Sequence, residues 1–112
     1  MIRNFITFVF FVIPVFGQAQ SLQTITKNNS AVAALEKENA AAAERELLGA
    51  MASDPFRSDL RYNLGLAFFI QKKFDRALKE FESVARAQPL GGDEKSQDLR
   101  FKALFNAALA SQ

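Results

Sequence analysis

The sequence contains no cysteine and no histidine, and each absence removes a class of chemistry. Without cysteine the chain can form no disulfide bond and has no thiol to serve as a nucleophile or to carry a lipid anchor. Without histidine it lacks the commonest general base and a common metal ligand. Carboxylates are the main groups left for such work, so these absences argue against catalysis and against a zinc site.

The sequence also lacks a strong charge of one sign. Its 112 residues include 14 basic and 12 acidic side chains, which gives a net charge of +2. A nearly neutral chain without a basic stripe is not typical of nucleic-acid binding. The best basic candidate, Lys72 and Lys73 beside Phe74, is more simply a polar turn before a core phenylalanine. No glycine-rich phosphate loop is present, because Gly91 and Gly92 only precede a charged linker.

Acidic residues occur in three pairs, each with one residue between the two carboxylates. These pairs are Glu36 with Glu38, Glu44 with Glu46, and Glu80 with Glu82. Residues two apart on a helix point in different directions, so a pair cannot act together on one substrate atom. Calcium-binding loops carry a glycine among their acidic residues, and none of these pairs has one. The sequence therefore predicts a protein that is not an enzyme and that uses no metal and no cofactor.

Residues 1–19 have the pattern of an export signal. Arg3 gives a positive start, an apolar run follows from Phe5 to Phe16, and the small residues Gly17 and Ala19 are separated by one position. The run is shorter than the roughly 20 residues that a membrane-spanning helix needs. We therefore predict cleavage before Gln20 and a periplasmic or secreted protein. An uncleaved N-terminal anchor in the inner membrane is the alternative.

The rest of the chain, residues 20–112, has the composition of an all-α domain. Alanine, leucine, glutamate and lysine dominate from residue 31 to residue 53, and they favour helix. Further helices are expected over 58–71, with Ser58 as the cap, over 74–88, and from residue 97 onward. Residues 21–30 fit either a loose leader or a poor helix. Gly65 lies inside an expected helix, where it costs about 1 kcal/mol, so we expect a close helix contact there, at Ala77.

Residues 58–91 resemble one tetratricopeptide repeat, a helix–turn–helix unit of about 34 residues. The residues that match the family's spacing are Leu64, Gly65, Phe68, Ala77, Phe81 and Pro89, with Phe74 starting the second helix. Arg61 stands where the family has tryptophan, which is a departure. The resemblance implies a short solenoid of paired helices and identifies the chain as similar to exported bacterial tetratricopeptide proteins.

Two flanking segments extend the resemblance. Residues 24–57 read as a degenerate repeat, because Ala43, Leu47 and Pro55 precede Ala77, Phe81 and Pro89 by one repeat length. The alternative there is one long alanine-rich helix that packs as a lid. Residues 93–112 read as a partial repeat or a capping helix, since 104–110 resembles 61–67. About three repeats are normally needed for stability, so the last helix is a cap, or the chain is a truncated piece of a longer array, or a partner supplies the missing surface.

Tetratricopeptide arrays hold partner segments on the concave surface that their first helices line. For this chain the resemblance implies the following contact residues: Asp59, Tyr62, Asn63, Leu66, Phe69, Lys102, Phe105, Asn106 and Leu109. Tyr62 is the only tyrosine and a good contact residue, because aromatic side chains give contact area at low entropy cost. The alternative is that Tyr62 packs against a neighbouring helix.

The expected function is therefore that of a non-catalytic adaptor of the bacterial cell envelope, which binds a protein or peptide partner on the concave face of a short array. Nucleic acid is not an expected partner. Two alternatives remain open at this point. The chain can be a structural subunit of a self-associating or membrane-associated assembly, or a truncated fragment of a longer tetratricopeptide protein.

Overall fold

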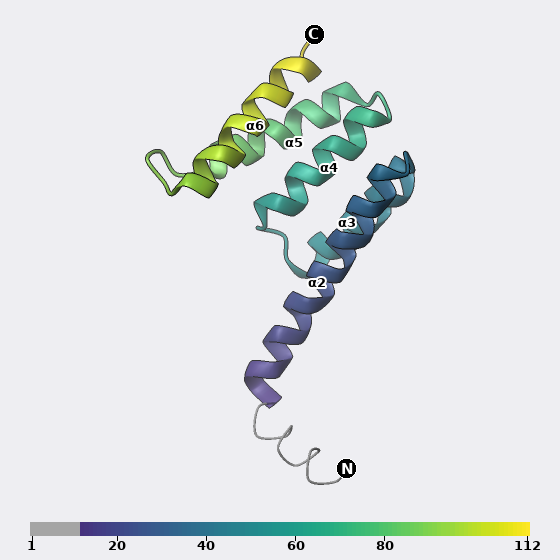
Figure 1. Cartoon of the computed structure of the whole chain (residues 1–112), viewed down its shortest axis with the longest axis vertical. Coiled ribbons are helices and arrows are strands. Elements are labelled where there is room, and N and C mark those ends of the chain that lie inside the picture. Colours follow the sequence, from purple (N-terminus) through teal and green to yellow (C-terminus); the bar gives the residue numbers. More distant parts are fainter. Residues whose placement is uncertain (1–11) are drawn as a thin grey trace.

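The computed structural model describes residues 12–112, with side chains from residue 22 onward, and this part of the chain is built from helices without strands. Its helices are α2 (Val12–Glu36), α3 (Ala40–Ser53), α4 (Ser58–Ile70), α5 (Phe74–Ala87) and α6 (Glu94–Ala110). Each helix packs against the one before it, so the five helices stack in chain order (Figure 1). The predicted all-α fold is confirmed.

Helix α2 runs through the segment in which the sequence suggested a cleavage site. The predicted export signal lies partly outside the described residues, and its positions 12–19 form the beginning of α2. Residues 21–30 are helical, so the loose leader considered for them is wrong. Within residues 12–112, no helix has both the length and the apolar character that crossing a membrane requires.

Helices α2 and α3 form one hairpin, and α4 and α5 form a second with the same connection. Three boundaries of the second hairpin follow those of the first by 34 residues, namely Ile70 after Glu36, Phe74 after Ala40 and Ala87 after Ser53, whereas α2 begins further from its turn than α4 does. The long alanine-rich helix considered for residues 31–53 is wrong, because the chain turns between Glu36 and Ala40. Asn39 caps α3 there, and its side-chain oxygen accepts from the backbone N–H of Ala42 at 3.3 Å.

The two turns share their backbone hydrogen bonds as well as their positions. Glu38 and Lys72 both adopt the left-handed conformation, with φ of 60° and 63°. The N–H of Glu38 donates to the carbonyl of Leu35, and the N–H of Lys72 donates to the equivalent carbonyl of Phe69. Such bonds satisfy the carbonyls that a helix end leaves unpaired. The same local solution therefore closes both hairpins.

Gly65 lies against the ring of Phe81, which corrects the contact expected at Ala77. A Cβ atom at residue 65 would stand 2.6 Å from Cε1 of Phe81. Phe81 is fully buried, so its ring cannot move aside easily. Ala77 is also fully buried, but the close approach of α4 and α5 is set by the ring one turn further along α5.

Two helix starts differ from the expected ones. Ser58 is the first residue of α4 rather than its cap, and its Oγ accepts from Nε2 of Gln88, the C-cap residue of α5, at 2.9 Å. The cap position belongs to Arg57, which forms no side-chain cap bond. Helix α6 begins at Glu94, ahead of the expected start at residue 97, because Asp93 caps it by accepting from the N–H of Ser96 at 2.8 Å.

Candidate functional site

The nine predicted contact residues divide between two helices and three kinds of environment. Those on α4 are Asp59, Tyr62, Asn63, Leu66 and Phe69, and those on α6 are Lys102, Phe105, Asn106 and Leu109. Three of them are polar side chains that join helices, two belong to surface ion pairs, and four are apolar. Only some of these side chains are free to meet a partner, because the others are engaged by neighbouring residues.

Two side-chain hydrogen bonds join α2, α4 and α6 along the face that carries these residues. Nδ2 of Asn63 donates to Oδ1 of Asn28 at 2.8 Å, which links α4 to α2. Nδ2 of Asn106 donates to the hydroxyl oxygen of Tyr62 at 2.8 Å, which links α6 to α4. Asn28 and Tyr62 are separated by one repeat period, so the two acceptors occupy equivalent places in the two hairpins.

Tyr62 makes its strongest contacts inside the protein. Its ring lies against the ring of Phe81 on α5, with 5.6 Å between the centroids, and its hydroxyl holds Asn106 on α6. Tyr62 therefore contacts both α5 and α6. The geometry favours the packing alternative considered for Tyr62, and its replacement would disturb the fold together with any surface that it lines.

Asp59 and Lys102 are engaged in ion pairs on the surface. Asp59 accepts from the guanidinium of Arg57 at 2.6 Å, a bond that raises the pKa of Arg57 above its ordinary value. Lys102 donates to Asp98, one turn earlier on α6, at 2.8 Å, and this bond raises the pKa of Lys102. Exposed ion pairs of this kind contribute little to stability and exchange readily with water.

The apolar members are covered on α4 and uncovered on α6. Leu66 and Phe69 are half-buried against the core, and Phe69 meets Phe74 edge-on at 5.3 Å between centroids. In contrast, Phe105 is 58% exposed and Leu109 is 40% exposed. These two lie one turn apart on α6, on either side of Asn106 in the sequence. The uncovered apolar surface among the predicted residues is therefore on the last helix.

Helix α6 also exposes two large apolar residues outside the predicted set. Phe101 is 69% exposed and Leu104 is 48% exposed. The sequence indicates them, because Phe101, Leu104 and Phe105 recur at the spacing of one helix side. The buried side of α6 is formed instead by small residues, Ala103, Ala107 and Ala110.

Among the described residues, Glu44 is the acidic side chain with the most hydrogen-bond partners on another hairpin. Glu44 on α3 accepts from Nε2 of Gln71 at 2.8 Å and from Nζ of Lys73 at 3.2 Å, so it ties the first hairpin to the turn of the second. The hydrogen bond from Gln71 is the largest cause that lowers the pKa of Glu44, and Lys73 adds to it. The two donors favour the ionised form of this carboxylate, which links the two hairpins.

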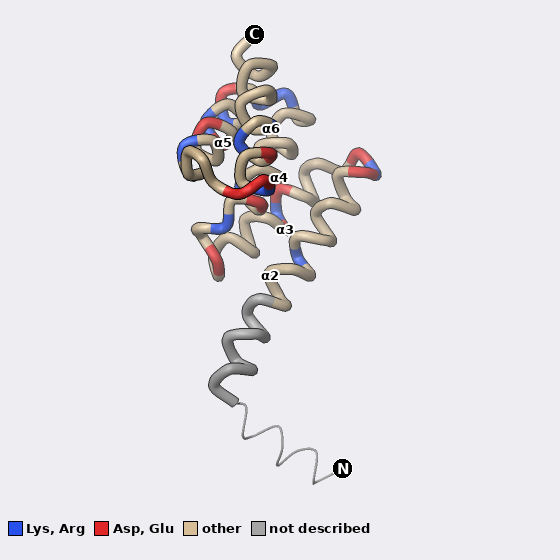
Figure 2. The backbone as a smooth tube through the Cα atoms, turned by 60° about the vertical axis from the view of Figure 1, so that its left-hand side comes forward, with Lys and Arg blue, Asp and Glu red and all other residues tan. Residues whose placement is uncertain are grey.

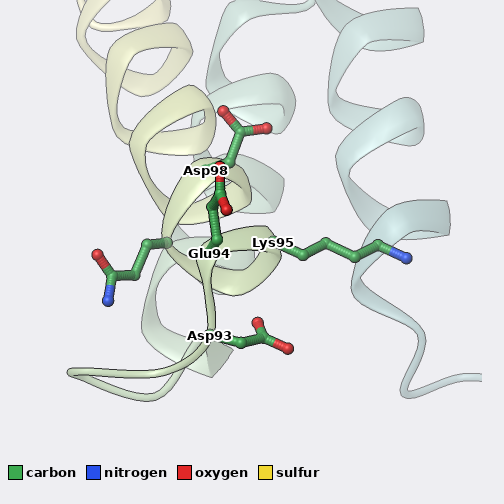
Figure 3. A pocket seen from close by; sticks show the side chains of 5 residues that line it. Asp93, Glu94, Lys95 and Asp98 are labelled. Carbon is green, nitrogen blue, oxygen red and sulfur yellow. The ribbon is translucent and has the colours of Figure 1, made fainter.

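A shallow hollow at the start of α6 holds the densest group of acidic side chains. Asp93, Glu94 and Asp98 line it with Lys95, which extends away from them (Figure 3). Asp93 is used as the helix cap, and its bond to the Ser96 N–H lowers its pKa. Among the described residues, no three or more acidic side chains are placed to hold a metal ion. Basic and acidic residues are interspersed along the backbone from α3 to the first half of α6 (Figure 2).

We find no family model, no curated protein and no solved structure that matches this chain.

Proposed function

We propose that the chain is a non-catalytic protein-interaction module, built as a short array of tetratricopeptide-like hairpins. It holds a peptide segment of a protein partner along the face that α2, α4 and α6 share. The support for the array is the displacement of 34 residues at three boundaries of the two hairpins (Glu36 to Ile70, Ala40 to Phe74, Ser53 to Ala87), together with their shared turn geometry. That displacement equals the period of the tetratricopeptide unit, about 34 residues.

The observation that carries the binding role is the pair of exposed apolar side chains beside the hydrogen bond between Asn106 and Tyr62. Phe105 and Leu109 remain in contact with water, whereas the polar residues of the same face are used to fasten the helices. Adjacent exposed apolar side chains on a surface held in place by buried contacts are typical of interaction sites. A partner segment with apolar side chains would cover them.

We also propose that the protein acts in the cell envelope, after export directed by residues 1–19. The support is the sequence pattern of this segment: Arg3, the apolar run and the small residues at positions 17 and 19. The intact mass of the protein recovered from its own cells tests this proposal. A mass that corresponds to residues 20–112 is expected, and a mass of the full chain in the cytosolic fraction would contradict export.

Selection of random linear peptides on the immobilised protein, followed by affinity measurement, tests the binding role. Leu109→Glu places a charge on the proposed surface, and we expect it to weaken the selected peptides at least tenfold. Leu48→Glu is the matched control, because Leu48 on α3 is exposed to a similar degree, 49% against 40%. Equal effects of the two variants, or no enriched peptide, would contradict the proposal. Tyr62→Ala is a poorer probe, since it also removes the contact with Phe81.

A second candidate function is that of a structural subunit that associates with its own copies. The extra exposed apolar residues of α6, Phe101 and Leu104, favour it, because they lie outside the predicted peptide-binding set.

A further inference from the structure

Helix α6 carries a set of uncovered side chains that we name the end face. The end face consists of Phe101, Leu104, Phe105 and Ala108, all four of which are exposed. Three of these side chains are large and apolar, and they recur at the spacing of one helix side. In a protein of this size such a cluster marks a surface that is covered in the working state.

The second hairpin shows what the end face corresponds to. The burial pattern of α6 repeats that of α4, since Ala103, Ala107 and Ala110 are buried at the same spacing as Leu60, Leu64 and Ala67. In this register the end face corresponds to four residues of α4: Ser58, Arg61, Tyr62 and Gly65.

All four of these α4 residues contact α5. Ser58 accepts from Gln88, Arg61 donates to Glu80 at 3.2 Å, and Tyr62 and Gly65 both meet the ring of Phe81. The end face is therefore the place on α6 where the preceding hairpin packs its second helix. Among the described residues, no helix occupies that place on α6.

The chemistry of the end face excludes a helix like α5 as its occupant. On α4, Ser58 and Arg61 form hydrogen bonds with the polar side chains of Gln88 and Glu80. The equivalent positions on α6 are Phe101 and Leu104, which cannot form such bonds. A glutamate placed against Leu104 would lose its water and gain no donor in return, which is unfavourable. The occupant must therefore be apolar along the whole length of the contact.

The end face itself meets this requirement, because all four of its residues are apolar. Its four positions are also symmetric about the point between Leu104 and Phe105. Two antiparallel copies of α6 would place Phe101 opposite Ala108 of the second copy, and Leu104 opposite Phe105 of the second copy. The large ring of Phe101 then meets a small side chain, as Phe81 meets Gly65 inside the protein. Packing of this kind fills space without overlap.

The charges of α6 fit the same arrangement. All charged side chains from Glu94 onward lie between residues 94 and 102, and residues 103–112 carry none. In Figure 2 the C-terminal part of α6 is accordingly free of blue and red. An antiparallel pair sets the charged half of each copy beside the uncharged half of the other, so no like charges are brought face to face.

We propose that the end face is a self-association site, at which α6 packs antiparallel against α6 of a second copy about a two-fold axis near Leu104. This contact does not use Leu109, but it shares Phe105 with the peptide-binding surface proposed above, so dimerisation and peptide binding compete for that side chain. Phe101 and Phe105 are 69% and 58% exposed and Leu104 is 48% exposed, so these side chains have roughly 350 Å² per copy left to bury, since a fully buried aromatic side chain contributes about 150–250 Å². About 700 Å² in total is below the usual size of specific interfaces, so the dimer is weak and dissociates reversibly on dilution.

The test measures the mass of the full-length protein by sedimentation equilibrium over a range of concentrations. Leu104→Arg places two like charges beside the axis and is expected to weaken dimerisation at least tenfold. Leu48→Arg is the control, because Leu48 and Leu104 are 49% and 48% exposed, and it should leave the dimer intact. Association through any other part of the chain is common to both variants, so the difference between them isolates α6.

A charge exchange gives the decisive result. Leu104→Glu and Leu104→Lys should each be monomeric, and an equimolar mixture should recover the dimer, because residue 104 of one copy neighbours residue 104 of the other. Circular dichroism of each variant shows whether it remains folded. A wild-type protein that stays monomeric at all concentrations, equal effects of the Arg variants, or no recovery in the mixture would overturn the proposal.

Discussion

The two hairpins α2–α3 and α4–α5 have the same turn but fill the space between their helices differently. In the second hairpin Gly65 lies against Phe81, a glycine against the largest fully buried side chain. The equivalent positions of the first hairpin, one repeat length earlier, are Ala31 and Leu47, and both are also fully buried. Each hairpin thus has one small and one large residue at these positions, and the larger ring in the second is matched by the loss of a methyl group on the facing helix.

This difference is the one expected if helix spacing depends on the sum of the facing side chains rather than on either one. Protein interiors are close-packed, so a larger ring needs a smaller partner if the backbones are to keep the same separation. The repeated turn holds both hairpins to one geometry, and the side chains have adjusted in pairs. Four measurements test whether the two hairpins are equivalent in this way.

The largest expected effect comes from adding one methyl group at the glycine of each hairpin. Gly65→Ala should lower the free energy of unfolding by about 1–2 kcal/mol, because overpacking against the Phe81 ring exceeds the gain in helix propensity. Gly49→Ala on α3 should raise it by about 0.5–1 kcal/mol, because its new Cβ would meet only the mobile side chain of Lys27, with Nζ at 3.2 Å. Urea unfolding followed by circular dichroism measures both.

The pairing itself is tested by combining two changes. Phe81→Leu together with Gly65→Ala gives the second hairpin the residues of the first, so the double variant should be more stable than the sum of the two single effects predicts. Simple additivity would show that Gly65 and Phe81 do not compensate each other.

The next effect concerns the link between the hairpins at Glu44. Because Gln71 and Lys73 lower the pKa of Glu44 in the folded protein, the unfolded chain takes up this proton at higher pH, and the link stabilises the fold above the ordinary pKa of about 4.5. Its contribution is lost as the pH falls from there through the lowered value. Glu44→Gln should therefore cost roughly 1 kcal/mol at pH 7 and progressively less toward pH 3.

Glu46→Gln is the control for this prediction, since Glu46 is exposed on the same helix. Unfolding free energies measured from pH 7 to pH 3 should converge for Glu44→Gln and the wild type. A constant difference between these two proteins across that range would contradict the role assigned to Glu44.

The smallest effect is expected at the two turns, which should respond alike. Glu38 and Lys72 both have positive φ, a conformation that costs a residue with a side chain about 1–2 kcal/mol. Replacing either by glycine should raise the unfolding free energy by about 0.5 kcal/mol, after the greater entropy of glycine in the unfolded chain is subtracted. Lys79→Gly, in the middle of α5, should instead lower it by about 1 kcal/mol. Opposite signs at Glu38 and Lys72 would show that the turns are not equivalent.

Much of the helical architecture could be predicted because the signals are local. Helices α4 and α5 end within one residue of their expected ends, where polar turn residues and Pro89 interrupt helix-favouring segments. The contact of Gly65 was assigned to the wrong residue, since the choice between Ala77 and Phe81 depends on how the two helices are rotated against each other. The predicted cap of α4 is wrong because Ser58 bonds to Gln88. This residue is distant in the chain and caps the end of α5.

The candidate contact residues show the same division. Their spacing places them on α4 and α6, as the structure has them, but spacing cannot tell which side chains face water. Tyr62, Asn63 and Asn106 are engaged by partners on other helices, whereas Phe105 and Leu109 are not covered. Contacts between helices decide which side chains are engaged, and the residue pattern of one helix does not contain that information.

The helical character of the chain, the turn at residues 71–73 and the lack of histidine and cysteine chemistry follow from the amino-acid sequence alone, because helix propensity, turn residues and composition act over a few neighbouring positions. The turn after Glu36, the small residue that receives Phe81, the polar residues that join the helices and the uncovered end face of α6 became known only from the structure. The last three are properties of the space between helices, and they exist only once residues distant in the chain are brought together.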